Sequence, residues 1–135
     1  SGLAVLFRGA GPAIELEFSS GERARGYTAV VCNARHYGGP FRVAPGASLR
    51  SPTLDVCVFH RGDRRAILRY ALGIAFGSRH LSFDDVSLYT VRDVRITDGG
   101  ARPVQVDGDD VRALPMRFSV AEKALVLCTP NGVIR

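Results

Sequence analysis

Two carboxylates flank a glycine in the run Val104-Gln105-Val106-Asp107-Gly108-Asp109. Val104 and Val106 alternate with Gln105, which predicts a strand that ends in an Asp-Gly turn. A carboxylate held at a strand end can accept the proton of a substrate hydroxyl, as a general base does. Asp-Gly turns are also common hairpin connectors, so the pattern by itself leaves a purely structural role open.

A second run, from Asn33 to Leu49, contains the glycine pair Gly38-Gly39 and two prolines. It begins where an apolar strand ends and leads into the apolar residues Leu54 to Phe59. The order predicts a strand, a tight glycine loop, an extended proline-containing loop and a further strand.

Other reactive residue types lack the partners that their chemistry requires. Three cysteines, odd in number and far apart, form no C-x-x-C pair, so neither zinc nor a disulfide framework is indicated: Cys32, Cys57 and Cys128. They lie in apolar runs, where free cysteine behaves as a small buried hydrophobe, and a reducing cytoplasm is the expected compartment. The histidines have no partner at metal-ligand spacing, and no serine stands in a G-x-S-x-G motif.

The net charge of +5 does not indicate a nucleic-acid partner, because the basic residues are scattered. All but one of the 18 basic residues are arginine, and they are interspersed among 13 acids rather than gathered with aromatic residues on a strand. We expect no nucleic-acid binding. A modest attraction to anionic lipid headgroups remains compatible with the charge.

The dominant hydrophobic period along the chain is two, which is typical of strands with one buried face. Ile14, Leu16 and Phe18 alternate with Glu15 and Glu17, and similar alternation recurs at 94–97, 104–106 and 116–120. Near-continuous apolar runs at 27–32 and 54–59 predict strands covered on both faces. Leu125 to Cys128 reads as a last apolar strand. Many short strands separated by Gly, Pro and Asp turns predict an antiparallel two-sheet β-sandwich in a single domain, 1–135.

One segment, from Asp63 to Phe76, has helical spacing instead. Asp63 can cap its amino end and Gly77 can end it. The apolar stripe that we expect to face the core comprises Ile67, Leu68, Ala71, Leu72 and Ala75. We interpret the arginines of the opposite face, Arg64, Arg65 and Arg69, as solvated surface.

In matching order over nearly the whole chain, these runs resemble the carboxy-terminal domain of bacterial diacylglycerol kinases and their sphingosine and ceramide kinase relatives. That family shows N-x-x-x-x-G-G-x-x-x-x-x-P-x-A, then D-G-x-L-D, then Q-x-D-G-E. Here Asn33, Gly38-Gly39, Pro45 and Ala47 match the first motif, and Gln105 to Asp109 match the last.

The resemblance implies one half of a two-domain, ATP-dependent lipid kinase that phosphorylates a diacylglycerol- or sphingosine-like hydroxyl. The family's amino-terminal domain carries a G-G-D-G-T nucleotide loop, which does not occur in this sequence. We therefore expect that domain to be the chain's partner in a longer, cytoplasmic and peripherally membrane-associated parent that uses ATP and magnesium. The isolated chain is expected to bind no cofactor and to be inactive; a homodimer stays open.

The same resemblance implies roles for single residues. Asp109 takes the place of the acid that acts as the base on the lipid hydroxyl, with a side chain one methylene shorter than the family's Glu. A shift of about 1 Å in a catalytic group can cost on the order of 100-fold in rate. Asn33, Gly38, Gly39, Asp107 and Gly108 would bind substrate or shape the site.

One departure weakens the family's magnesium site. Where the family has D-G-x-L-D, this chain has Ser51-Pro52-Thr53-Leu54-Asp55, so the first carboxylate is missing. Magnesium prefers carboxylate oxygens, and Ser48, Ser51 and Thr53 offer none. We predict no metal site here.

Two other hypotheses stay open on the sequence alone. A lipid- or membrane-associated β-sandwich without catalytic activity would explain the altered Ser51-Pro52 turn. An unrelated β-domain that assembles with itself would require the motif match to be accidental.

Overall fold

The computed structural model describes residues 3–6, 13–33, 41–48, 50–98, 103–106, 109–113, 116–120, 127–129 and 132–134. For the strands at 3–6, 103–106, 109–113, 127–129 and 132–134, the description is of the backbone alone. The predicted Asp107, Gly108, Gly38 and Gly39 lie outside the described residues.

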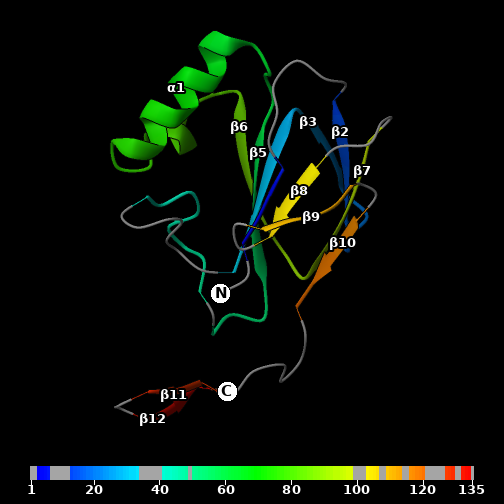
Figure 1. Cartoon of the computed structure of the whole chain (residues 1–135), viewed down its shortest axis with the longest axis vertical. Coiled ribbons are helices and arrows are strands. Elements are labelled where there is room, and N and C mark those ends of the chain that lie inside the picture. Colours follow the sequence, from blue (N-terminus) through cyan, green and yellow to red (C-terminus); the bar gives the residue numbers. More distant parts are fainter. Residues whose placement is uncertain are drawn as a thin grey trace.

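Two antiparallel sheets face each other and one helix covers the outer side of the larger sheet (Figure 1). The six-stranded sheet has the order β6-β5-β4-β1-β8-β9, with bounds Val86–Val91, Leu54–Phe59, Thr28–Cys32, Leu3–Leu6, Pro103–Val106 and Asp109–Ala113. The four-stranded sheet has the order β10-β7-β2-β3, with bounds Met116–Ser119, Asp93–Asp98, Ile14–Phe18 and Arg23–Gly26. A separate hairpin pairs β11 (Leu127–Thr129) with β12 (Gly132–Ile134). The predicted β-sandwich with one packed helix is confirmed.

The main core lies between the two sheets, where the period-two residues point inward. In β2, Ile14, Leu16 and Phe18 are buried while Glu15 and Glu17 are exposed. They pack against the inward residues of β4, β5 and β7: Ala29, Val31, Leu54, Val56, Val58, Val94 and Ile96. Each Å² of apolar surface that this layer removes from water stabilises the fold by about 25 cal/mol.

A second core lies between the six-stranded sheet and the helix. Every residue of β5 is buried, and four of the five in β4 are, which confirms the two-sided burial that their apolar runs predict. The outer side chains of these strands, among them Cys32, Cys57 and Phe59, pack against Ala66 and Tyr70 of the helix. The segment 41–48 covers the same face with Val43, Ala44 and Ala47.

Helix α1 (Arg64–Ala75) begins and ends as its sequence predicts. The Asp63 carboxylate accepts a hydrogen bond from the Ala66 N–H at 3.2 Å, which satisfies one of the unpaired amides of the first turn. After the C-cap residue Phe76, Gly77 adopts φ 82°, a conformation that glycine reaches without steric cost.

The buried stripe of α1 is not the predicted one. Leu68, Ala71, Leu72 and Ala75 are exposed, and Ile67 is only half-buried. The helix buries Ala66, Tyr70 and Gly73 instead.

The alternative stripe is buried because it fits the aromatic residues beneath it. The Tyr70 ring lies 4.8 Å from that of Phe59, centroid to centroid. Gly73 lets the helix approach the short 3₁₀ helix η1 (Arg79–Ser82), since a Cβ at Gly73 would lie 2.8 Å from the His80 nitrogen. Two apolar stripes run along this helix. The buried one contains Tyr70, which packs against Phe59, and Gly73, which leaves room for His80.

Candidate functional site

The strand register brings several of the predicted site residues to one end of the six-stranded sheet. There the ends of β4, β6 and β8 meet the starts of β1, β5 and β9, and we call this the site edge. Cys32, at the end of β4, pairs with Asp55 near the start of β5 and with Leu3 at the start of β1. Asp55 in turn pairs with Thr90 near the end of β6. The segment 48–53, which precedes β5, therefore reaches the same edge as Asn33, which follows β4.

Asp109 begins β9 and lies on the neighbouring row of this edge. It pairs with Val106, which ends β8, and Val106 pairs with Ala4, whose other partner is Val31. The backbone of Asp109 thus lies at the start of a strand, and its predicted exposure toward a cleft stays a prediction. Strands β8 and β1 lie between β9 and β4, so at about 4.8 Å per strand Asp109 is about 14 Å from β4 along the sheet. The two sequence motifs share an edge but are not in contact through the sheet.

Asn33 offers a hydrogen-bond acceptor at this edge. Its side-chain Oδ1 is buried and has no hydrogen-bond partner among the described residues. Buried polar atoms are nearly always paired in folded proteins, so an unpaired one marks a place where another group can bind.

Hydroxyl groups occupy the turn where the resembled family has a carboxylate. Ser51 Oγ and Thr53 Oγ1 lie 2.5 Å apart and share a hydrogen bond. The Ser48 Oγ accepts from the Arg50 N–H at 3.2 Å, and the Ser48 carbonyl accepts from the Ser51 N–H at 3.0 Å. These donors and acceptors satisfy one another within the turn.

The turn does not fit a magnesium ion. The nearest buried carboxylate, Asp55, accepts a hydrogen bond from the Thr90 hydroxyl at 2.8 Å and lies beneath Gly46, on the side of β5 that faces the segment 41–48. No group of three or more His, Cys, Asp or Glu side chains within the described ranges is placed to hold a metal. A site for this hard cation needs several oxygen ligands that include carboxylate.

Asp55 and Thr90 belong to the site edge, although the sequence analysis named Asp55 only as the last residue of the turn at 51–55 and did not name Thr90. Asp55 is only 7% exposed, and a buried carboxylate is costly unless it is hydrogen-bonded. The signal was present, because Asp55 is the one charged residue within an otherwise apolar strand. Its partner Thr90 is adjacent only through the pairing of β5 with β6.

The cysteines next to this edge are not nucleophiles. Burial, with a contribution from the Asp55 carboxylate, raises the pKa of Cys32 to about 12. Burial also raises the pKa of Cys57 to about 12, with Cys32 adding to the effect. Both thiols stay protonated at neutral pH, as expected of cysteines that act as small hydrophobes.

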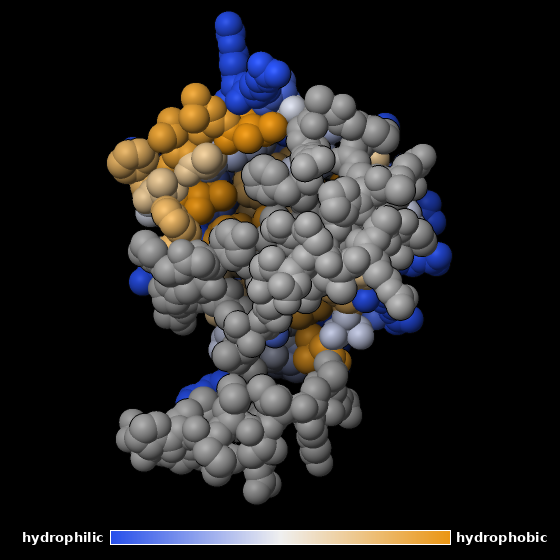
Figure 2. Space-filling model, in the orientation of Figure 1, coloured by the Kyte–Doolittle hydropathy of each residue, from blue (hydrophilic) through white to orange (hydrophobic). Residues whose placement is uncertain are grey.

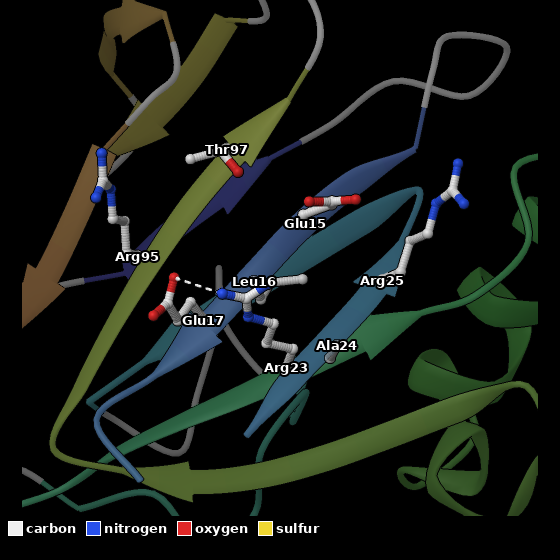
Figure 3. Close-up of a pocket in the computed structure, with 8 residues that line it drawn as sticks. All are labelled: Glu15, Leu16, Glu17, Arg23, Ala24, Arg25, Arg95 and Thr97. Carbon is white, nitrogen blue, oxygen red and sulfur yellow. Dashed lines mark ion pairs between the residues drawn. The ribbon is translucent and has the colours of Figure 1, made fainter. Parts of the chain in front are cut away.

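A hollow of about 480 Å³ lies elsewhere, on the outer face of the four-stranded sheet (Figure 3). Its charged side chains come from β2, β3 and β7, and they face each other across the strands, Glu15 opposite Arg25 and Glu17 opposite both Arg23 and Arg95. Arg23 reaches Glu17 at 3.9 Å, with both side chains well exposed. Cross-strand pairs of opposite charge stabilise a sheet surface modestly, and none of the predicted site residues lies here. The hollow is a solvated surface on which two glutamates face three arginines.

Residues 8–129 match the family described as the YegS C-terminal NAD kinase beta sandwich-like domain. The chain belongs to this family. The match covers most of the sequence, and the YegS-type β-sandwich with its helix is the fold described above.

Comparison with individual proteins agrees with this family. The chain is 28% identical over 103 residues to "Putative lipid kinase YtlR" of Bacillus subtilis, a match that covers 75% of this chain and 32% of the relative. A solved structure of "a putative diacylglycerol kinase" from Bacillus anthracis superposes with a TM-score of 0.67 at 16% identity, over 84% of this chain and 38% of the other. Another, of a diacylglycerol kinase from the same organism, gives 0.60 at 12% identity, over 87% and 46%.

The chain thus has the fold of the carboxy-terminal domain of a lipid-kinase-like family and spans about a third of the length of its curated relative. No helix in the described part of the chain is long and apolar enough to cross a membrane.

Proposed function

We propose that this YegS-type domain is the lipid-binding half of an ATP-dependent lipid kinase, with Asp109 as the general base on the lipid hydroxyl. The observation that supports this proposal is the register of the six-stranded sheet, in which the start of β9, Asn33 and the segment 48–53 share the site edge. A second domain that delivered ATP to this edge would meet all three.

The chemistry asks little of this half beyond positioning and proton acceptance. Phosphoryl transfer proceeds with little bonding to the protein, so the enzyme must hold the attacking hydroxyl in line and accept its proton. Asp109 is the first residue of a strand, and strands hold functional side chains more precisely than loops do. The unpaired Oδ1 of Asn33 supplies a hydrogen-bond acceptor for a polar group of the lipid headgroup.

The proposed substrate is a neutral lipid with a free hydroxyl, such as a diacylglycerol or a sphingosine-like base. The proposed phosphoryl donor is ATP with its magnesium, bound by an amino-terminal domain of the parent protein. The proposed parent is cytoplasmic and attached peripherally to the membrane that supplies the lipid. The hydroxyl-lined turn at 48–53 has no step in this mechanism.

The test is Asp109→Asn in the full-length parent, assayed with ATP and either lipid in mixed micelles. Asparagine keeps the shape and removes the proton-accepting charge, so we expect turnover to fall on the order of 100-fold or more with the melting temperature little changed. Asp110→Asn is the matched control, since it removes the same charge from the adjacent residue of the same strand. Turnover unchanged in Asp109→Asn would remove Asp109 from the mechanism.

A second candidate is a lipid-associated domain without catalytic activity. The observation that favours it is the turn at Ser51, where hydroxyls bond to each other in the place of a carboxylate. A wild-type parent that binds lipid vesicles but phosphorylates neither lipid would establish this alternative.

A further inference from the structure

The exposed face of α1 carries a ridge of large apolar side chains. Leu68, Leu72 and Phe76 follow one another at four-residue spacing and are 62%, 49% and 68% exposed. Residues at this spacing lie one above the other on a helix surface. Figure 2 shows hydrophobic residues gathered over α1 at the upper left of the molecule. With the Phe83 ring, the ridge borders a hollow of about 410 Å³.

The charged side chains that line this hollow are all cations. Arg65, Arg69 and Arg79 line the hollow and no acid does. Helix α1 contains no Asp or Glu in any of its 12 residues. Arg69 forms an ion pair with Asp85 and lies over the Phe83 ring, 4.6 Å from its centroid. Arg65 and Arg79 have no ion pair among the described residues, so their charge is available to an anionic partner.

Folding stability alone does not favour this arrangement. Arg64 and Arg65 occupy the first turn of α1, where the helix dipole repels cations and favours acids. Three large apolar side chains exposed in a row are also unusual for a surface that meets only water. Both features become favourable when the ridge is covered by a partner with negative charge and an apolar interior.

We infer that the Leu68–Leu72–Phe76 ridge and its arginines form the surface by which this domain docks onto an anionic lipid bilayer. An interfacial helix buries its apolar residues at the level of the acyl chains while basic side chains reach the headgroups. A second copy of the chain fits less well, because an isologous contact would bring the same unpaired arginines together.

The ridge is connected to the candidate site through the segment 41–48. Just beyond α1, the Ser78 hydroxyl donates to the Arg42 carbonyl at 2.7 Å, and the His80 ring nitrogen Nε2 lies 2.8 Å from the Val43 carbonyl oxygen. The same segment leads to Ser48 and the site edge. The inference thus deepens the proposed function and rests on it. A bilayer bound at α1 would supply lipid next to the segment 41–48, which continues to the site edge.

The test measures co-sedimentation of the 135-residue chain with vesicles of phosphatidylcholine, alone or mixed with phosphatidylglycerol. We expect binding to the mixed vesicles that weakens as salt rises and little binding to phosphatidylcholine alone. The double variant Leu68→Gln/Leu72→Gln should bind on the order of 10-fold more weakly because it removes the inserted side chains. Leu88→Gln, at an exposed leucine outside the hollow, is the control and should bind as the wild type does.

Two double variants that remove the same charge test whether binding depends on the arginines beside the ridge or on the overall charge of the domain. Arg65→Gln/Arg79→Gln should lower the affinity on the order of 10-fold, whereas Arg23→Gln/Arg95→Gln removes equal charge from the opposite layer and should change it far less. Circular dichroism melting confirms that each variant is folded. The inference would be overturned if both double arginine variants lost vesicle affinity equally, or if the wild type bound no vesicles. It would also be overturned if the ridge caused dimerisation in analytical ultracentrifugation without vesicle binding.

Failure of the docking surface can be distinguished from failure of the proposed catalytic role of Asp109. Asp109→Asn should bind vesicles as the wild type does even if it abolishes lipid phosphorylation in the parent. Loss of activity with intact vesicle binding tests the base, and loss of vesicle binding with the ridge variants tests the docking surface.

Discussion

His80 shows how one buried residue links the helix layer to the segment that leads to the site. Its side chain is fully buried between α1 and 41–48, where its ring lies 6.0 Å from that of Phe59, centroid to centroid. Burial lowers the pKa of His80 below its ordinary 6.5, and the backbone carbonyls of Val43 and Gly73 offset this only in part. The folded protein therefore holds this imidazole neutral.

The pH dependence of the free energy of unfolding should reflect the titration of His80. Because the folded pKa lies below the unfolded one, the unfolded state binds the proton more readily, so stability falls as pH drops from 6.5 toward the folded pKa. We expect urea denaturation of the wild type to show a larger loss between about pH 7.5 and about pH 5 than that of His80→Gln. Glutamine can still donate to the Val43 carbonyl but does not titrate. Identical pH profiles would show that His80 does not titrate on unfolding in this range.

At the scale of the element, one position of α1, Gly73, suits what the helix packs against rather than the preference for helix. Its interior contains Gly73, a poor helix former, at the point of closest approach to η1. A side chain there would collide with the His80 backbone and the Phe83 ring, because an added Cβ would lie 2.8 and 3.0 Å from them.

Replacing this glycine should therefore reverse the usual effect of alanine. Gly73→Ala would raise helix propensity by about 1 kcal/mol in an exposed position, but here the overpacking should outweigh it and lower the free energy of unfolding by about 1–2 kcal/mol. Ala71→Gly, on the exposed face, serves as the reference and should cost about 1 kcal/mol through propensity alone. Chemical denaturation measures both. A stabilised Gly73→Ala would mean that the helix is free to shift away from η1.

At the scale of the whole molecule, the domain presents a polar sheet edge, an apolar cationic helix face and an outer sheet face with charges of both signs. A kinase needs a donor site as well as an acceptor site, and the G-G-D-G-T motif of a nucleotide loop does not occur in this sequence. The proposed division of labour assigns that loop to another domain of the parent.

The isolated chain should accordingly not bind ATP. Calorimetric titration of the 135-residue chain with magnesium-ATP is expected to give no saturable heat, because backbone amides that cradle phosphate are supplied by such loops. The full-length parent, titrated under the same conditions, is the positive control. Saturable binding to the chain alone would contradict the proposed division between the two halves.

The sequence by itself determined the fold class, the ends of the helix and the family. Alternation in Ile14–Phe18 places one face of the strand inward, and the apolar run Leu54–Phe59 requires cover on both faces. Asp63 and Gly77 end the helix through contacts with their immediate neighbours. Such features are local, so a period or a cap residue is sufficient to predict them.

Only the tertiary structure decided which stripe of α1 is buried and which residues share the site edge. Ile67, Leu68 and Leu72 fit the helical period as well as Ala66 and Tyr70 do, and the choice depends on Phe59 and His80, which lie on other elements. Asp55 and Thr90 are 35 residues apart and meet through strand register, as does the row from Asp109 to Val31. These relations follow from packing between distant segments, which a local hydrophobic period does not encode.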